Sequence, residues 1–235
     1  MKLFYAPEIE ETLTLSEEES AHCVRVLRLT SGDEVFAFDG KGTFFKLRII
    51  VPHPKHTEVE ILQRNVSLPK NYHIHVAIAP TKNIERFEWF LEKCTEIGID
   101  EVTPILCQFS ERKMIKRERL EKILISAAKQ SLKANVPILN ELSTIDDLIK
   151  NKKETDCFIA HCYKQERNDF LSICPKQRSV LILIGPEGDF SPSEVENAIS
   201  LGFVPVSLGE SRLRTETAGI VACHIANLVQ QLGLS

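Results

Sequence analysis

The sequence predicts an α/β protein in two parts: a small β-barrel domain over residues 1–68 and a larger domain with a mostly parallel sheet over residues 69–235. In the first part, short β-type segments are joined by tight turns. From His73 onward, strand-like and helix-like segments alternate. Within this second part, Leu181–Ile184 is an uninterrupted apolar run, as expected of a central parallel strand that is buried on both faces.

One short helix and three strands are expected in the first part. Ser16 followed by Glu19 is the signature of a capping box, which predicts a helix that begins there and ends near Leu29. The pattern of β-branched and aromatic residues predicts strands over Val35–Phe38, Thr43–Ile50 and Thr57–Leu62, with a turn at Asp39–Gly42 between the first two. Residues 65–72, which include Pro69, are the expected linker.

The second part opens with a strand, a helix and a strand. Apolar residues recur at helical spacing over Ile84–Ile97, and Gly98 follows as a helix stop. Strands are expected on either side, over His73–Ala79 and Glu101–Leu106. The elements expected further on are helices over Lys116–Lys133, Thr144–Lys150 and Thr217–Gln230, and strands over Asp156–Ala160 and Ser179–Ile184. The last helix is apolar on almost every face, which predicts that it is buried or lies in an interface.

Composition restricts the class of protein. The net charge of −4 excludes a whole-molecule electrostatic attraction to nucleic acid, although Phe109–Asn135 contains eight Lys or Arg against three Glu. That window is either a local nucleic-acid contact or an ordinary solvated helix face. Seven cysteines, without a leader-like apolar segment at the start, favour a cytoplasmic protein over a secreted disulfide scaffold. No apolar run approaches the roughly 18 residues of a membrane helix.

Two strand–loop–helix stretches carry the strongest functional signal. Val180–Ala198 reads VLILIGPEGDFSPSEVENA, and Leu208–Ala222 reads LGESRLRTETAGIVA. In the first, Ser191 and Glu194 predict a capping box with Pro192 at the first helical position. Because open α/β sheets bind ligands at the carboxyl ends of their strands, two such loops at adjacent strand ends predict a cofactor crevice. The G-x-G-x-x-G and P-loop patterns are absent from the sequence, so dinucleotide and P-loop functions lose their main support.

The two stretches resemble the cofactor-binding end of the SPOUT methyltransferases, and specifically the RsmE-type family. The matching motifs are Gly185-Pro186-Glu187-Gly188 and Leu208-Gly209 followed by Leu213-Arg214-Thr215-Glu216-Thr217-Ala218. The resemblance implies S-adenosylmethionine as the cofactor, the N3 atom of a uridine in 16S rRNA as the methyl acceptor, a deep trefoil knot, a PUA-like N-terminal barrel and a homodimer. Asp189 departs from the family, which often has glycine there.

The resemblance also assigns residues to roles. The expected cofactor-binding residues are Leu183, Gly185, Glu187, Gly188, Leu208, Gly209, Leu213, Thr215 and Thr217. Arg214 and Glu216 are the expected catalytic residues: the first to stabilise the uridine anion, the second, with His22 as an alternative, to help remove the proton. RNA is expected to contact His22, Arg25, Arg28, Arg112 and Lys113. Surface charge for the arginines and helix capping for the threonines are the alternative interpretations.

Other functions remain open at this point. The loops do not exclude a SPOUT enzyme that methylates a ribose 2′-hydroxyl or another RNA base, or a non-catalytic RNA-binding module. A metal site is not expected, because His53 and His56 lie among prolines, His73 and His75 alternate on a strand, and the Cys residues have no zinc-type spacing.

Overall fold

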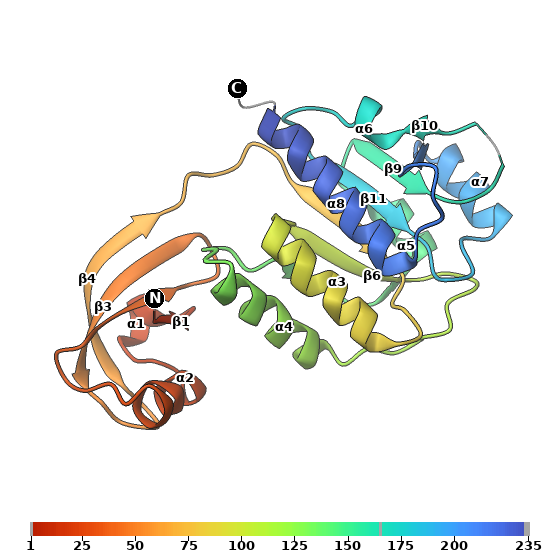
Figure 1. Ribbon diagram of the computed structural model, residues 1–235. Coiled ribbons are helices and arrows are strands. Elements are labelled where there is room, and N and C mark those ends of the chain that lie inside the picture. Colours follow the sequence, from red (N-terminus) through yellow and green to blue (C-terminus); the bar gives the residue numbers. More distant parts are fainter. Residues whose placement is uncertain (1, 165, 233–235) are drawn as a thin grey trace. The chain divides into compact units, whose positions relative to one another are not determined.

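The computed structural model describes residues 2–164 and 166–232 (Figure 1). Contacts divide the chain into two compact units. The first comprises Met1–Pro69 together with Ile125–Val136, and the second comprises Lys70–Leu124 together with Pro137–Ser235. Each unit has a sheet of its own. None of the helices in the described part of the chain has the length and apolarity to cross a membrane.

The first unit is built on a four-stranded sheet. Its strands follow the order β1 (Leu3–Tyr5), β2 (Glu34–Phe38), β3 (Thr43–Val51) and β4 (Glu58–Val66). The pair β1–β2 is parallel, and the other two pairs are antiparallel. Alternation along β3 places Phe45, Leu47 and Ile49 in the core. The strands β2 and β3 lie where the sequence predicts them, and β4 runs on past the predicted end at Leu62 to Val66, into the expected linker. The strand β1 and the short helix α1 (Ile9–Thr12) were not predicted.

The helix at Ser16 differs from its prediction. Ser16 Oγ accepts a hydrogen bond from the backbone N of Glu19, so the N-cap is confirmed. However, α2 (Glu17–Ala21) ends early and continues as a π-helical turn (His22–Val26), so the prediction of one helix to Leu29 was wrong. The Glu19 carboxylate accepts from the backbone N of Tyr5 and from Lys129 Nζ, at 3.0 and 2.6 Å. The Glu19 carboxylate therefore makes tertiary contacts instead of accepting from the backbone N of Ser16, the second hydrogen bond of a capping box.

The second unit is a parallel sheet with helices on both faces. The strands follow the order β10, β12, β9, β11, β5, β6, β7, and β8 pairs with β6. Their bounds are β5 (Ile74–Ile78), β6 (Glu101–Leu106), β7 (Ile138–Leu139), β8 (Ser143–Thr144), β9 (Asp156–Ala160), β10 (Asn168–Asp169), β11 (Val180–Ile184) and β12 (Val204–Ser207). The helices are α3 (Ile84–Ile97), α5 (Ile145–Asn151), α6 (Phe170–Ile173), α7 (Pro192–Ser200) and α8 (Thr215–Leu232), together with the part of α4 (Arg117–Gln130) that precedes Ile125; the rest of α4 belongs to the first unit. The alternation of strands and helices confirms the predicted α/β class.

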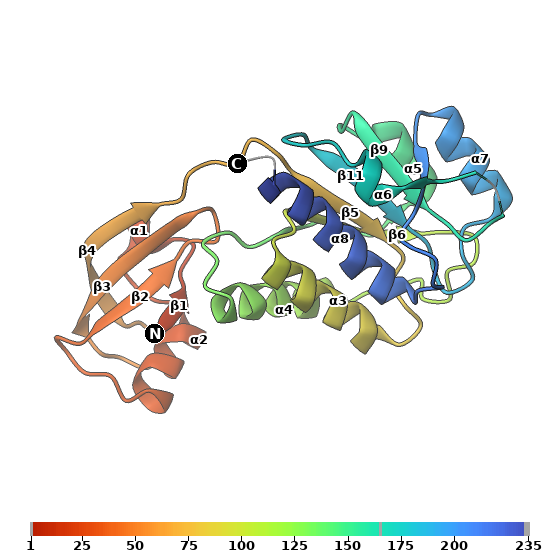
Figure 2. The same cartoon turned by 45° about the horizontal axis from the view of Figure 1, so that its top comes forward.

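The two faces of this sheet are covered by different helices. Alternate residues of β5 and β11, among them Ala77 and Leu183, pack with residues of α5 and α7 in one core cluster. On the other face, α8 lies alongside α3 and packs against β5 (Figures 1 and 2). Gly219 permits this close approach, because a Cβ on it would lie only 2.6 Å from the ring of Phe90. The trefoil knot implied by the family resemblance stays a prediction.

The strand order corrects one expectation about the site. The loops that follow β11 and β12 were expected at adjacent strand ends, but β9 lies between these two strands and pairs with both. Sequential strands are not always spatial neighbours, and local patterns do not encode pairing across the chain. The segment after β9 is consequently a third wall of any site formed between the two predicted loops.

Candidate functional site

A cavity of about 260 Å³ opens where β9 and β11 end and α8 begins. Apolar side chains from β11 and from the loop before α8, Ile184 and Leu213, form part of its wall. Charged side chains, among them Arg86, Glu187 and Arg214, form another part. The full lining is Arg86, Ala160, Cys162, Ile184, Gly185, Pro186, Glu187, Asp189, Arg212, Leu213, Arg214, Thr215 and Ala218. The mixture of apolar walls and a few polar groups is typical of a small-molecule site.

A second cavity of about 360 Å³ adjoins the first. The two share Cys162, Asp189 and Arg212 in their linings. The remaining lining residues of the second cavity are Tyr163, Arg167, Gly209, Glu210 and Ser211. Together the two cavities follow the carboxyl ends of β9, β11 and β12, where ligands bind in open α/β sheets.

The loop after β11 owes its shape to local sequence. A Cβ on Gly185 would lie 3.1 Å from the ring of Phe190, closer than an ordinary van der Waals contact, so glycine favours this close approach. Asp189 adopts a left-handed conformation, with φ of 68°, and its carboxylate accepts from the backbone N of Cys162 at 2.8 Å. The loop ends in the predicted capping box of Ser191 and Glu194, which is confirmed. Asp189 thus links the loop after β11 to the segment after β9.

The loop before α8 completes the cavities. Gly209 has φ of 116°, a conformation that L-residues with a side chain rarely adopt, and Ser207 Oγ is hydrogen-bonded to its backbone. Arg212 and Arg214 are exposed, while Thr215 is buried at the start of α8. The guanidinium groups of Arg212 and Arg214 therefore face ligand or solvent while the helix start is fixed in the core.

The structure brings together only some of the predicted cofactor residues. Gly185, Glu187, Leu213 and Thr215 line the first cavity and Gly209 lines the second. Four others lie outside both linings. Leu183 is buried in the core cluster with α5 and α7, Gly188 packs against Phe109, and Leu208 and Thr217 are half-buried.

The two predicted catalytic residues have different surroundings. Arg214 lines the first cavity. Glu216 is buried, and its Oε1 lies 3.9 Å from Nε of Arg86, which lines the cavity from the first turn of α3. Glu216 Oε2 is buried without a hydrogen-bond partner among the described residues. A buried carboxylate oxygen in this state is energetically unfavourable, and such a cost is often retained where the group has a function.

Sequence reasoning missed several lining residues. Arg86 lies on the polar face of α3 and has the pattern of an ordinary solvated charge, Cys162 belongs to no recognised motif, and Asp189 was noted only as a departure from the family. Arg212 stands in the second stretch but was assigned no role of its own. The positive φ of Asp189 could have been suspected, since the residue stands in a turn between Gly188 and Phe190, but its contact with Cys162 is a tertiary feature.

The predicted RNA-binding residues fall in both units. In the first unit, Arg25 and Arg28 are exposed and His22 is half-buried, with its ring edge-on to Phe4 at 6.0 Å between centroids. In the second unit, Lys113 is exposed. The guanidinium of Arg112 instead donates hydrogen bonds to the backbone carbonyls of Thr81 and Lys82.

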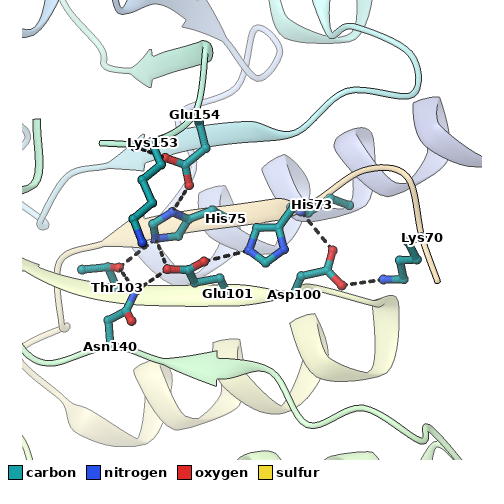
Figure 3. Close-up of polar contacts among 10 residues, drawn as sticks. Lys70, His73, His75, Asp100, Glu101, Thr103, Asn140, Lys153 and Glu154 are labelled. Carbon is teal, nitrogen blue, oxygen red and sulfur yellow. Dashed lines mark hydrogen bonds and ion pairs between the residues drawn. The ribbon is translucent and has the colours of Figure 1, made fainter. Parts of the chain in front are cut away.

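A separate polar network lies at the amino ends of β5, β6 and β9, at the opposite strand ends from the cavities (Figure 3). His75 is buried, with Nδ1 2.6 Å from Glu154 and Nε2 2.7 Å from Thr103 Oγ1. His73 Nε2 lies 2.7 Å from Glu101, and this hydrogen bond holds the pKa of Glu101 at about 2 and raises the pKa of His73. The network is a set of hydrogen-bonded histidine, carboxylate and hydroxyl groups within the sheet.

Among the described residues, only His75, Glu101 and Glu154 form a group that could hold a metal ion. The two carboxylates lie on opposite sides of the imidazole, Glu154 at Nδ1 and Glu101 3.8 Å from Nε2. A metal ion takes one ring nitrogen, with its other ligands on the same side. Hydrogen bonds therefore account for this arrangement better than a metal does, and the expectation of no metal stays a prediction.

Comparisons with known proteins agree with this two-part architecture. Residues 68–227 match the model of the RNA methyltransferase domain, and residues 15–62 match that of the RNA methyltransferase PUA domain. The ribosomal RNA small subunit methyltransferase E of Synechocystis is 30% identical over 233 residues, covering 94% of this chain and 75% of that protein.

Two crystal structures are similar over almost the whole chain. A probable rRNA-methyltransferase from Porphyromonas gingivalis has a TM-score of 0.93 at 47% identity, covering 99% of each chain. A methyltransferase from Legionella pneumophila, solved with the bound cofactor SAM, has a TM-score of 0.83 at 28% identity, covering 93% of this chain and 92% of that one. With both domains matched in order, the chain belongs to the RsmE-type family of RNA methyltransferases, with a PUA domain followed by a SPOUT-type methyltransferase domain.

Proposed function

We propose that this chain transfers the methyl group of S-adenosylmethionine to N3 of a specific uridine in the 16S rRNA of the small ribosomal subunit. The observation that carries the proposal is the pair of adjoining cavities at the strand ends, lined by both family motifs, in a chain whose other unit matches an RNA methyltransferase PUA domain. The names of the full-length relatives support the small-subunit rRNA as the substrate class.

The residues present fit this cofactor. Ile184, Leu213 and Ala218 offer apolar surface to the adenosine part, and Glu187 and Asp189 offer negative charge to a cofactor that carries a sulfonium and an ammonium group. Thr215 and the free backbone N–H groups at the start of α8 suit the carboxylate. When bound, the cofactor supplies the methyl group as a strong electrophile, so the protein has mainly to align the acceptor and exclude water.

The acceptor is the harder chemical problem. Uridine N3 is protonated when neutral and is a poor nucleophile, so its proton must leave as the new bond forms. Arg214, at the cavity wall, would stabilise the negative charge that spreads to the O2 and O4 atoms. Glu216, whose buried Oε2 has no hydrogen-bond partner in the described part of the chain, is a candidate acceptor of the proton. His22 is the alternative.

The RNA would be bound largely through its phosphates. Arg25, Arg28 and Lys113 are exposed cations that suit this contact, and His22 lies beside Arg25 on the π-helical turn. Sequence-specific RNA recognition mostly uses unstacked bases, so we expect the target uridine to leave its stack. Binding should weaken as the salt concentration rises.

We further infer that two copies of this chain pair through α8, and that they act in the cytoplasm, where ribosomal subunits are assembled. The helix is mostly apolar, yet it leaves Leu228 38% and Leu232 57% exposed. Exposed leucines on a largely apolar helix are typical of an interface. Light scattering with Leu228→Glu tests the dimer: the variant should have the mass of a monomer, and the mass of a dimer would contradict pairing through this face of α8.

The test of function is methyl transfer from labelled S-adenosylmethionine to small subunits that lack the modification, with the product nucleoside identified by mass spectrometry. N3-methyluridine at one position is the expected product. A 2′-O-methyl product would favour the alternative SPOUT activity, and cofactor binding without transfer to any RNA would favour a binding module.

Arg214→Ala should lower kcat/KM by about 10²–10³-fold, the usual effect of removing one stabilising donor from a developing anion. Arg214→Lys, which retains the charge, should recover part of the loss. Arg178→Ala is the matched control, because Arg178 pairs with Asp156 outside both cavity linings. Full activity in Arg214→Ala would contradict its role.

A further inference from the structure

The side chain of Arg112 forms hydrogen bonds within the protein, although its basic sequence context is typical of a phosphate contact. Its Nε donates to the carbonyl of Thr81 at 2.9 Å, and its Nη2 donates to the carbonyl of Lys82 at 2.6 Å. A guanidinium can make two such bonds at once because its donors lie in one rigid plane. Arg112 therefore fixes two successive peptide groups of the loop that joins β5 to α3.

That loop in turn contacts the first family motif. The backbone N of Lys82 donates to Glu187 Oε1 at 2.9 Å. Glu187 lines the first cavity and is otherwise an exposed side chain on an exposed turn. A chain of three hydrogen bonds thus runs from Arg112 through the peptide groups at Thr81 and Lys82 to the Glu187 carboxylate.

Other residues of the segment after β6 contact the loop after β11, which carries Glu187. Phe109 packs against Gly188, where an added Cβ would lie 3.0 Å from Phe109 Cβ. The backbone N of Gln108 donates to Glu194 Oε1 at 2.7 Å, and Glu194 belongs to the capping box that ends the loop. The strands β6, β5 and β11 are neighbours in the sheet, so these contacts join three consecutive strand ends.

We infer that Arg112 is a positioning residue for the cofactor: it holds the Glu187 carboxylate in the cavity by fixing the loop at Thr81 and Lys82. This inference rests on the proposed function, since it assumes that the cavity takes S-adenosylmethionine. A glutamate that is already held in place loses less conformational entropy when it binds a ligand. Arg112 therefore contributes to cofactor affinity without touching the cofactor.

The matched variants are Arg112→Ala, Arg112→Lys and Lys113→Ala. Cofactor affinity is measured by calorimetric titration with S-adenosylmethionine, and RNA affinity by gel shift with a 16S rRNA fragment. We expect Arg112→Ala to weaken cofactor binding by roughly three- to tenfold, the effect of leaving one side chain to be immobilised on binding. Arg112→Lys should recover part of this, because an ammonium reaches one carbonyl but lacks the planar fork. Lys113→Ala should weaken RNA binding alone.

Hydrogen exchange of residues 185–190 in the absence of cofactor provides a second readout, and it should be faster in Arg112→Ala than in the wild type. Unchanged cofactor affinity in Arg112→Ala, or an equal loss in Lys113→Ala, would overturn the inference. Loss of RNA binding with unchanged cofactor affinity would make Arg112 a phosphate contact. If the wild type binds no S-adenosylmethionine, the proposed function itself fails. If it binds but Arg112→Ala is indistinguishable from it, only the role of Arg112 fails.

Discussion

Replacing Glu101 by glutamine tests whether the network at the amino ends of the strands makes stability depend on pH. The Glu101 carboxylate is hydrogen-bonded to His73 Nε2 at 2.7 Å and accepts from Asn140 Nδ2 at 2.5 Å. These contacts hold its pKa at about 2, against 4.5 for an ordinary glutamate. The folded state therefore binds this proton more weakly than the unfolded state does, and the stabilisation is present above pH 4.5 and lost as the pH falls toward 2.

The magnitude follows from the two pKa values. Their difference corresponds to about 3 kcal/mol of unfolding free energy at pH 6, falling to about 2 kcal/mol at pH 3.5. The raised pKa of His73 arises mainly from the same hydrogen bond, so it is not counted again. Its stabilisation is present at pH values below the ordinary histidine pKa and is lost as the pH rises through the raised value. The pair is consequently strongest in mildly acidic solution.

The assay is urea unfolding followed by fluorescence of Trp89, the single tryptophan, which lies on α3 in the same unit. The stability difference between wild type and Glu101→Gln should shrink by roughly 1 kcal/mol between pH 6 and pH 3.5. Glu141→Gln is the control, because the Glu141 side chain is 83% exposed. Parallel pH profiles for the wild type and Glu101→Gln would refute the reasoning.

Two further predictions concern packing and capping. Gly219→Ala should lower the urea midpoint reported by Trp89, because overpacking against the ring of Phe90 costs roughly 1–3 kcal/mol and exceeds the gain of about 1 kcal/mol in helix propensity; a raised midpoint would contradict the close contact. Ser191→Ala should cost about 1 kcal/mol of stability by removing the N-cap of α7. An unchanged urea midpoint in Ser191→Ala, measured by the same assay, would contradict that assignment.

Local patterns predicted the elements whose signals are local. The bounds of α3 agree with the periodic segment that ends before Gly98, which has φ of 124° at the C-cap. The buried strand β11 and the capping box at Ser191 also follow from short runs of sequence. In α3 and the capping box the decisive interactions connect residues within four positions of one another and depend little on the rest of the fold, whereas β11 was visible from its apolar run although it pairs with the distant strands β5 and β9.

The features that were missed depend on distant parts of the chain. The insertion of β9 between β11 and β12 is a matter of strand pairing, which no local pattern encodes. The π-helical turn after Ala21 interrupts a sequence with good helical signals. Arg86 and Arg112 were visible as charges, but only the fold decides that the first lines a cavity and the second binds two carbonyl groups. The sequence shows that a side chain is charged, whereas only the fold shows which group it contacts.

The discontinuity of the first unit limits how this protein can be divided or recombined. The unit is completed by residues 125–136, whose sequence lies within that of the other unit. A gene fragment that stopped at Pro69 would leave the Glu19 carboxylate without Lys129, and would uncover Leu3 and Phe38 where Ala128 now packs. The first unit therefore cannot be exchanged between enzymes as one continuous stretch of DNA, and a chimeric enzyme that is to keep this unit intact must contain both segments.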